Sequence, residues 1–179
     1  LQHKQQLSGI VGAVAELIDV PSSFTLAIET ALGGAAQHVI VENEHDARQA
    51  ITYLKKQRGG RATFLPLTTI KPRQLPAHVL SQAAAVDGFL GIASEQVTFP
   101  AEIQTVVHNL LGTILLAKDL TSANAIAQTI RYQYRVVSLE GDVMNAGGSM
   151  TGGANKRGNQ GSLFSQNQEL KQLTAEYEQ

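Results

Sequence analysis

The chain has 179 residues, of which 43% are hydrophobic and 16% charged, and its formal net charge is −1. This composition predicts a globular chain of one domain or two small halves, so that any binding of nucleic acid must depend on a local basic patch. The absence of cysteine excludes disulfides, thiolate metal sites and cysteine nucleophiles. Because no apolar run could span a membrane and no signal peptide begins the chain, we expect a soluble, intracellular protein. The first residue is not Met, which suggests a piece of a longer protein.

The first predicted unit begins with a helix. In "FTLAIETALGG", residues 24–34, apolar side chains recur at helical spacing and stop at a pair of glycines, which predicts one helix with one buried face. Residues 39–41, "VIV", predict a buried strand. A second helix should follow, with Ala50 and Ile51 directed inward, and "RATFLPL" should close the unit as a second strand.

The same order returns further along the chain. "IQTVVHNLLG", residues 103–112, repeats the first helix 79 positions later, and residues 114–116 predict the next buried strand. A helix with Ala125 and Ile126 inward and the strand "RVVSLEG" complete the second unit. Helices alternating with short strands indicate a mixed α/β sheet in each half, and the Pro-rich stretch "TTIKPRQLPAHVLSQAAAVDG" is expected to connect the halves.

A glycine-rich stretch, "GDVMNAGGSMTGGANKRGN", occupies residues 141–159. It is not a phosphate-binding loop, because Gly153 and Ala154 occupy the positions that would have to be Lys and Ser or Thr. The dinucleotide fingerprint also fails in every frame. Ser149 and Thr151 have no candidate base nearby in sequence, and no two histidines are spaced as a helical metal-binding pair. No catalytic or metal site is predicted.

Charged residues gather in two places. Glu42, Glu44 and Asp46 should favour a helix start and face water. Six of the 14 basic residues fall within 19 positions of one another, and one more pair follows the glycine stretch. Such cations can neutralise phosphates without reading bases, although solvated helix ends would explain them as well. The basic positions are Lys55, Lys56, Arg58, Arg61, Lys71 and Arg73, followed by the pair Lys156 and Arg157.

Both ends of the chain carry leucines among polar residues. Leu163, Leu170, Leu173 and Tyr177 follow one another at intervals of 7, 3 and 4, which is the spacing of a coiled coil. "LQHKQQL" at the start is of similar composition. Periodicity alone leaves two possibilities open: coiled-coil segments, or an amphipathic terminal helix folded on its own domain.

Three stretches together resemble a known family: "ALGGAAQHVIVENEHDARQAITYLKKQRGGRATFLPL", "LLGTILLAKDLTSANAIAQ" and "RVVSLEGDVMNAGGSMTGG". They look like the hinge domain of bacterial structural maintenance of chromosomes (SMC) proteins, over residues 10–153. The resemblance implies an α+β, mixed α/β fold of two pseudo-repeated subdomains flanked by an antiparallel coiled coil. Its expected bounds are coil 1–8, subdomain 9–75, connector 76–85, subdomain 86–160 and coil 161–179.

The resemblance also implies a function. SMC hinges homodimerise through a glycine motif, whose residues here are Gly147, Gly148, Ser149, Thr151, Gly152 and Gly153, and they bind DNA weakly through basic residues. The matching basic positions are Lys55, Lys56, Arg58, Arg61, Lys156 and Arg157. No enzymatic activity or cofactor is expected in this piece, because ATP and Mg²⁺ belong to the head of the full-length protein, where kleisin-type subunits would also bind. The expected location is the cytoplasm, on the nucleoid.

Two other functions remain open from the sequence. The chain could be chiefly a DNA-binding module whose dimerisation is incidental, or a nucleotide-dependent enzyme whose glycine loop holds a cofactor. The failure of both nucleotide-binding motifs weighs against the second of these. Dimerisation at micromolar concentration separates the hinge from a DNA-binding module.

Overall fold

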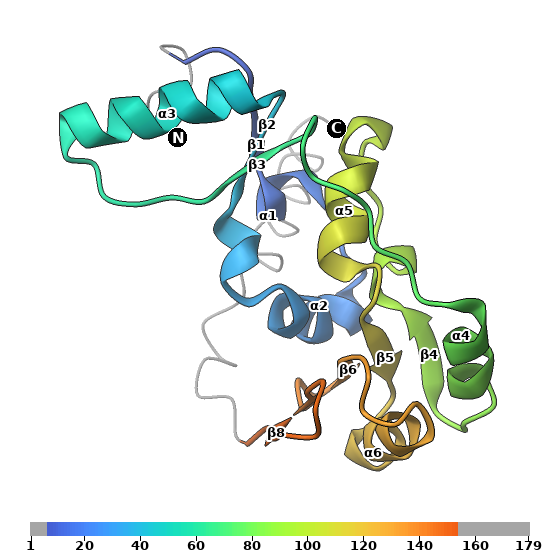
Figure 1. Ribbon diagram of the computed structural model, residues 1–179. Coiled ribbons are helices and arrows are strands. Elements are labelled where there is room, and N and C mark those ends of the chain that lie inside the picture. The colour runs from blue at the N-terminus through green and yellow to red at the C-terminus, as the bar shows by residue number, and fades with distance from the viewer. Residues whose placement is uncertain (1–6, 154–179) are drawn as a thin grey trace, which may run out of the picture.

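The computed structural model describes residues 7–153 and contains two short sheets surrounded by helices (Figure 1). The expected coiled-coil segments, and with them Lys156 and Arg157, lie outside the described residues except for the two positions 7 and 8. In chain order the elements are β1 (Ile10–Ala13), α1 (Val14–Leu17), α2 (Thr25–Leu32), β2 (Val39–Val41), α3 (Glu44–Gln57), β3 (Phe64–Pro66), α4 (Ala77–Ala84), β4 (Phe89–Ile92), α5 (Gln104–Leu111), β5 (Leu115–Ala117), α6 (Leu120–Thr129), β6 (Val136–Ser138), β7 (Val143–Met144) and β8 (Met150–Thr151).

Both sheets are built on one three-strand pattern. β1 pairs antiparallel with β2, which pairs parallel with β3, and β4, β5 and β6 repeat this arrangement. β7 and β8 then extend the second sheet as an antiparallel hairpin. The register of the first strand shifts at the same place in each unit, between Ile10 and Gly12 and between Phe89 and Gly91. The internal repeat predicted from the sequence is therefore confirmed, together with the mixed α/β character of both halves.

An equivalent glycine stands immediately before the first strand of each unit and lies against the start of a later helix. Gly9 has a φ of +77° and Gly88 a φ of +92°, a region that other residues rarely adopt. A Cβ on Gly9 would collide with Asp46 at the start of α3, and a Cβ on Gly88 would collide with Ser122 at the start of α6. The close approach of the first strand to the start of the helix therefore requires glycine at this position in each unit.

The two units meet at equivalent positions. Asp19 and Thr98, which are 79 residues apart, exchange two backbone hydrogen bonds of 2.8 and 2.9 Å. The helices α2 and α5, equivalent in the repeat, also contact one another (Figure 1). Each unit contributes the equivalent position to this reciprocal contact, which is the arrangement expected for two halves related by a local two-fold axis.

Three groups of buried apolar side chains hold the fold. The largest is shared by both units and includes Ile28 of α2 and Leu111 of α5. A second group packs α4 and α6 onto the second sheet, with Ile126 at its centre. The third is small, and its buried members are Val39, Val41 and Ala47 between β2 and α3. The helix α3 contributes only Ala47 to these groups, whereas α6 contributes Ala123, Ile126 and Ala127.

Two local expectations need amendment. Residues 77–84, within the expected connector, form the helix α4, whose Val79 and Ala83 belong to the second core group. The inward orientation predicted for Ile51 is wrong, because its side chain is 42% exposed whereas Ala50 is buried. The second half of α3 projects away from the small sheet (Figure 1), and none of its residues after Ala50 is buried.

Candidate dimer and nucleic-acid interfaces

The hairpin of β7 and β8 forms one edge of the five-stranded sheet. Asn145 N–H donates to the Ser149 carbonyl at 2.8 Å, and Met144 is paired with Met150. Hydrogen-bonded and non-hydrogen-bonded pairs alternate along an antiparallel ladder, so the N–H and C=O of Met150 point away from β7. The Met150 side chain is 61% exposed. Among the described residues, no strand pairs with the outer edge of β8.

The turn of this hairpin is anchored to the loop that follows α6. Gly147 N–H donates to the Tyr132 carbonyl at 2.8 Å, and Gly148 N–H donates to the Asn145 carbonyl at 3.0 Å. Arg131 and Tyr132 themselves have left-handed backbone angles, with φ of 59° and 58°. Since non-glycine residues adopt such angles at a cost, packing around this loop must hold them. The anchored turn fixes the direction in which the hairpin extends.

The hairpin and its turn contain glycines, whose backbone is not covered by a side chain. Gly147, Gly148 and Gly153 have φ of +93°, +105° and +132°. A Cβ on Gly147 or Gly153 would meet no atom within 4 Å, whereas one on Gly152 would lie 2.7 Å from Asp142 Oδ1. The described residues therefore leave open space beside Gly147 and Gly153, which another backbone could approach.

Hydrogen bonds close the base of the hairpin. Asp142 N–H donates to Ser138 Oγ at 3.1 Å, and Ser138 Oγ–H donates to Asp142 Oδ2 at 3.0 Å. Gly141, with φ of +88°, completes a tight turn between them. This bonding accounts for Asp142 as a turn residue.

The first sheet has an open edge at the position that β7 covers in the second sheet. The β3 residue Phe64 is equivalent to Val136 of β6, which pairs with β7. Because the Thr63 carbonyl and the Leu67 N–H both bond to β2, the backbone groups of Phe64 point to the other side. No strand covers that side within residues 7–153. Sequence reasoning missed this edge, although Pro66 stands where β6 has Ser138, and a proline is typical of edge strands.

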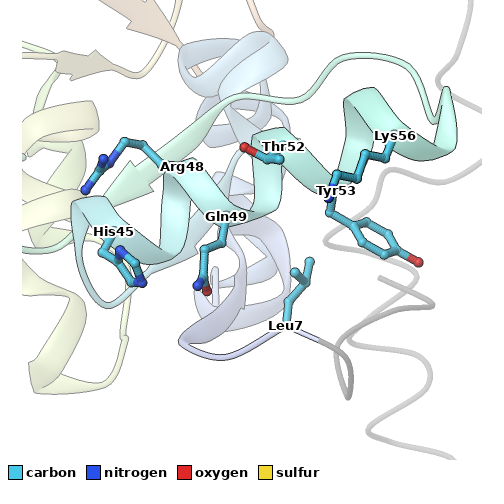
Figure 2. Close-up of a pocket in the computed structure, with 7 residues that line it drawn as sticks. All are labelled: Leu7, His45, Arg48, Gln49, Thr52, Tyr53 and Lys56. Carbon is cyan, nitrogen blue, oxygen red and sulfur yellow. The ribbon is translucent and has the colours of Figure 1, made fainter.

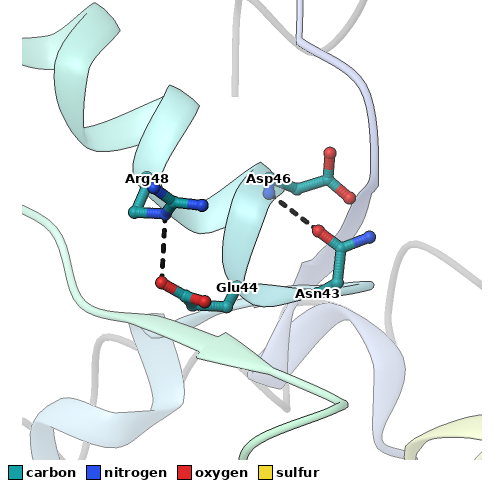
Figure 3. A network of polar contacts seen from close by, with 4 residues as sticks. All are labelled: Asn43, Glu44, Asp46 and Arg48. Carbon is teal, nitrogen blue, oxygen red and sulfur yellow. Dashed lines mark hydrogen bonds and ion pairs between the residues drawn. The ribbon is translucent and has the colours of Figure 1, made fainter.

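The helix α3 begins at a capped N-terminus (Figure 3). Asp46 N–H donates to Asn43 Oδ1 at 2.9 Å, and Arg48 forms an exposed ion pair of 3.0 Å with Glu44. Asp46 does not face water as predicted: it is buried and accepts a 3.2 Å hydrogen bond from Ser8 Oγ–H. Its position against Gly9 explains the burial, which a sequence pattern could not reveal.

The predicted basic residues lie on the projecting end of α3. Lys55 and Lys56 occupy its last turn, where cations interact favourably with the helix dipole. Arg58 follows as the C-cap, with a left-handed φ of 49°, and Arg61 lies in the irregular segment before β3 rather than in the strand. All four are exposed. This end lies far from the hairpin of β8 (Figure 1), so the basic end of α3 and the candidate dimer surface are separate.

Two other kinds of site are absent from the described part of the chain. No three His, Asp or Glu side chains there are grouped so as to hold a metal ion. No helix within residues 7–153 has the length and apolar character needed to cross a membrane.

Comparison with known proteins identifies the family. Residues 7–127 match the model of the SMC proteins flexible hinge domain. The chain therefore belongs to the SMC hinge family.

Individual relatives agree with this assignment. The chain is 51% identical over 174 residues to the chromosome partition protein Smc of Bacillus subtilis; the match covers 97% of the chain but only 15% of that relative. Its structure is similar to one chain in the crystal structure of an asymmetric dimer of the Geobacillus stearothermophilus SMC hinge domain. The TM-score is 0.91 and the identity 46%, and the match covers 98% of this chain and 69% of that one. The Pyrococcus furiosus SMC hinge domain follows at a TM-score of 0.69 and 34% identity, covering 84% and 75%.

Proposed function

We propose that the chain is a non-enzymatic homodimerisation hinge whose principal contact is the hairpin of β7 and β8. The observation that carries this proposal is the uncovered edge of β8, with exposed Met150 at its centre. An exposed edge strand is a template for another strand, and glycines let a partner backbone approach closely. The relative from Geobacillus stearothermophilus supports the proposal, since it crystallised as a dimer. The contact residues we propose are Gly147, Gly148, Ser149, Thr151, Gly152 and Gly153.

The open edge of β3 is the surface to which the hairpin of a second copy would fit. In the second unit of the same chain, β7 covers the equivalent strand β6, so the fold already contains one example of such a contact. If β8 of each copy approaches β3 of the other, two equivalent contacts arise around a two-fold axis. Such an arrangement closes as a dimer and leaves neither edge open.

Light scattering of the 179-residue chain over a range of micromolar concentrations tests dimerisation. We expect a dimer for the natural sequence and a monomer for Met150→Asp, because the added carboxylate would be buried without a partner in the interface. Leu120→Asp is the matched control: Leu120 is also an exposed apolar residue, at the start of α6, and its replacement should leave the dimer intact. A natural chain that remains monomeric, or a dimeric Met150→Asp variant, would overturn the proposal.

A size series at Gly147 separates interface contact from backbone strain. Gly147→Ala and Gly147→Leu impose similar strain at a φ of +93°, and neither meets an atom of its own chain within 4 Å at Cβ. They differ in the space that they occupy outside the molecule. We expect Leu to weaken the dimer far more than Ala, while urea unfolding of the two monomers differs little. Equal dimer affinities would place the contact elsewhere.

We further propose weak, sequence-independent DNA binding by Lys55, Lys56, Arg58 and Arg61, together with Lys156 and Arg157. The first four are exposed, and three of them lie at the projecting end of α3. This supports the proposal, because exposed cations can reach phosphates. The alternative, a DNA-binding module with incidental dimerisation, shares these residues. Changing Lys55, Lys56 and Arg58 to Gln should reduce the salt dependence of DNA affinity by about two to three phosphate contacts. Unchanged salt dependence would contradict the proposal.

The wider role that we propose is that of the longer protein. The curated relatives are chromosome partition proteins of which this chain spans about 15%, and that name supports a role in chromosome segregation. We propose condensation as well, with the protein in the cytoplasm on the nucleoid. The hinge would join two coiled-coil arms into a ring or V. ATP, Mg²⁺ and kleisin-type subunits would act at the distant heads, so this chain should neither bind nor hydrolyse ATP. Calorimetry with ATP tests that expectation directly.

A further inference from the structure

A groove runs along one face of α3 beside the N-terminal end of the described chain (Figure 2). Its cavity has a volume of about 480 Å³. Two rows of side chains at a spacing of four residues form its helical wall, and Leu7 lies opposite (Figure 2). We call this surface the α3 groove; its first row is Arg48, Thr52 and Lys56, and its second is His45, Gln49 and Tyr53.

The α3 groove is lined by groups that donate hydrogen bonds. Arg48 and Lys56 are cations, Gln49 and Thr52 are exposed polar side chains, and the described residues that line the groove include no carboxylate. Of the acidic residues in the first turn, Glu44 is paired with the groove's own Arg48, and Asp46 is buried against Ser8. Because the Glu44–Arg48 pair is exposed, it contributes little, and a phosphate can replace the carboxylate beside Arg48. A surface with this bias favours a ligand rich in negatively charged acceptors.

The groove has the length and direction expected for a phosphate backbone. His45 and Lys56 are eleven residues apart on one helix, or about 17 Å, a distance that corresponds to about five phosphates of one strand along a duplex. Lys56 at one end of the groove is followed closely by Arg58, the C-cap of α3, and is preceded by Lys55 in the same last turn. A chain of phosphates leaving the basic end of α3 would therefore find further donors along the same face.

We propose that the α3 groove binds the phosphate backbone of nucleic acid, extending the DNA contact from the end of α3 to its first turn. This inference rests on the proposed DNA binding and assigns to it Arg48, Gln49 and Thr52, which sequence reasoning did not select. The equivalent helix α6 offers a comparison, because its residues Ile126 and Ala127 are buried in the core. Of these two equivalent helices, α3 is the one that projects from its sheet (Figure 1).

A matched pair of charge substitutions tests the effect on affinity. Gln49→Glu places a carboxylate in the α3 groove, and Gln128→Glu makes the same change on the exposed surface of α6. The affinity of the 179-residue chain is measured by fluorescence anisotropy with a labelled 20-base-pair duplex and a labelled 20-nucleotide oligo(dT) at low salt. We expect Gln49→Glu to weaken binding of at least one probe about fivefold and Gln128→Glu to change neither. Equal effects of the two variants would overturn the inference.

A second measurement reports occupancy of the groove itself. The natural chain has no cysteine, so Thr52→Cys and Gln128→Cys each introduce one thiol at an exposed position. We expect saturating DNA to slow alkylation of the thiol at position 52 severalfold, and added salt to restore the rate, while position 128 is unaffected. Unchanged alkylation at position 52 under saturating DNA would overturn the inference even if affinities differ.

The two proposals fail in distinguishable ways. If Gln replacement of Lys55, Lys56 and Arg58 abolishes binding while Gln49→Glu matches Gln128→Glu and position 52 stays reactive, DNA binds only at the helix end. The groove inference is then wrong and the proposed DNA function stands. If the natural chain binds neither probe at low salt, both are wrong.

Discussion

The two crossover helices of this chain occupy equivalent places in the repeat but have different surroundings. In α6 the consecutive residues Ile126 and Ala127 are both buried, whereas the equivalent positions of α3 are Ala50, which is buried, and Ile51, which is 42% exposed. The helix α4 also packs on α6, and no counterpart covers α3 among the described residues. One copy of the motif therefore supplies core, while the other supplies a projecting helix that is available for contact.

The two sheets also differ at the edge formed by their third strand, β3 or β6. The second unit continues through Ser138 into a hairpin, since Ser138 N–H donates to the Asp142 carbonyl at 2.9 Å. In the first unit Pro66 occupies the equivalent position and has no N–H to donate. The two units are therefore asymmetric at this edge: the second carries an added hairpin, and the first keeps an open edge within residues 7–153.

The largest expected effect lies in the second core. Ile126→Ala should lower the free energy of unfolding by about 3 kcal/mol, because a fully buried side chain leaves a cavity. The same substitution at Ile51, on α3, should cost less than about 0.5 kcal/mol. Urea denaturation of both variants checks the comparison. Similar losses at the two sites would show that α3 is packed as firmly as α6.

Amide hydrogen exchange should order the two helices. The second half of α3 contains no buried residue after Ala50, whereas α6 is buried through Ile126 and Ala127. Segments with few buried apolar contacts open at lower free energy. We expect amides of residues 52–57 to exchange by local opening and those of α6 near the rate of global unfolding. The reverse order would contradict the proposed division between core helix and projecting helix.

The helix caps should respond differently to pH. Asp119 accepts hydrogen bonds from Ser122 and lies near Lys118; mainly through the bond to the Ser122 backbone N–H, these contacts lower its pKa below the ordinary value of 3.8. A carboxyl group with a lower pKa in the folded state stabilises the fold above its unfolded pKa and loses this effect as pH falls through the folded pKa. The stability difference between the natural chain and Asp119→Asn should therefore shrink below about pH 4. At the equivalent cap, the effect of Asn43→Ala should stay constant over the same range, because an amide does not titrate.

The smallest effects are expected at the residues with left-handed backbone angles. Arg131→Gly should raise the free energy of unfolding by up to about 1 kcal/mol, because glycine adopts a φ of 59° without a steric penalty. Arg58→Gly at the end of α3 should stabilise the fold similarly while weakening DNA binding. Gln133→Gly is the control, since its φ is not positive, and it should destabilise slightly. Thermal unfolding distinguishes these outcomes.

Local patterns in the sequence predicted most of the elements. The helical spacing before Gly33 and Gly112 and the apolar runs at 39–41 and 114–116 correspond to α2, α5, β2 and, displaced by one residue, β5. These predictions succeeded because the periodicity of burial is written into neighbouring residues. The exposure of Ile51 and the burial of Asp46 could not be predicted, because each depends on a layer that is distant in sequence: one missing, the other supplied by Gly9 and Ser8.

The sequence by itself determined the repeat, the family resemblance and the failure of both nucleotide-binding motifs, since each of these follows from residue types at fixed spacing. Only the tertiary structure decided which edges and faces remain open. The outer side of β8, the free side of β3 and the α3 groove are defined by what does not pack against them within residues 7–153. A pattern of side chains specifies what a segment can bury, whereas the arrangement of all segments decides what stays exposed.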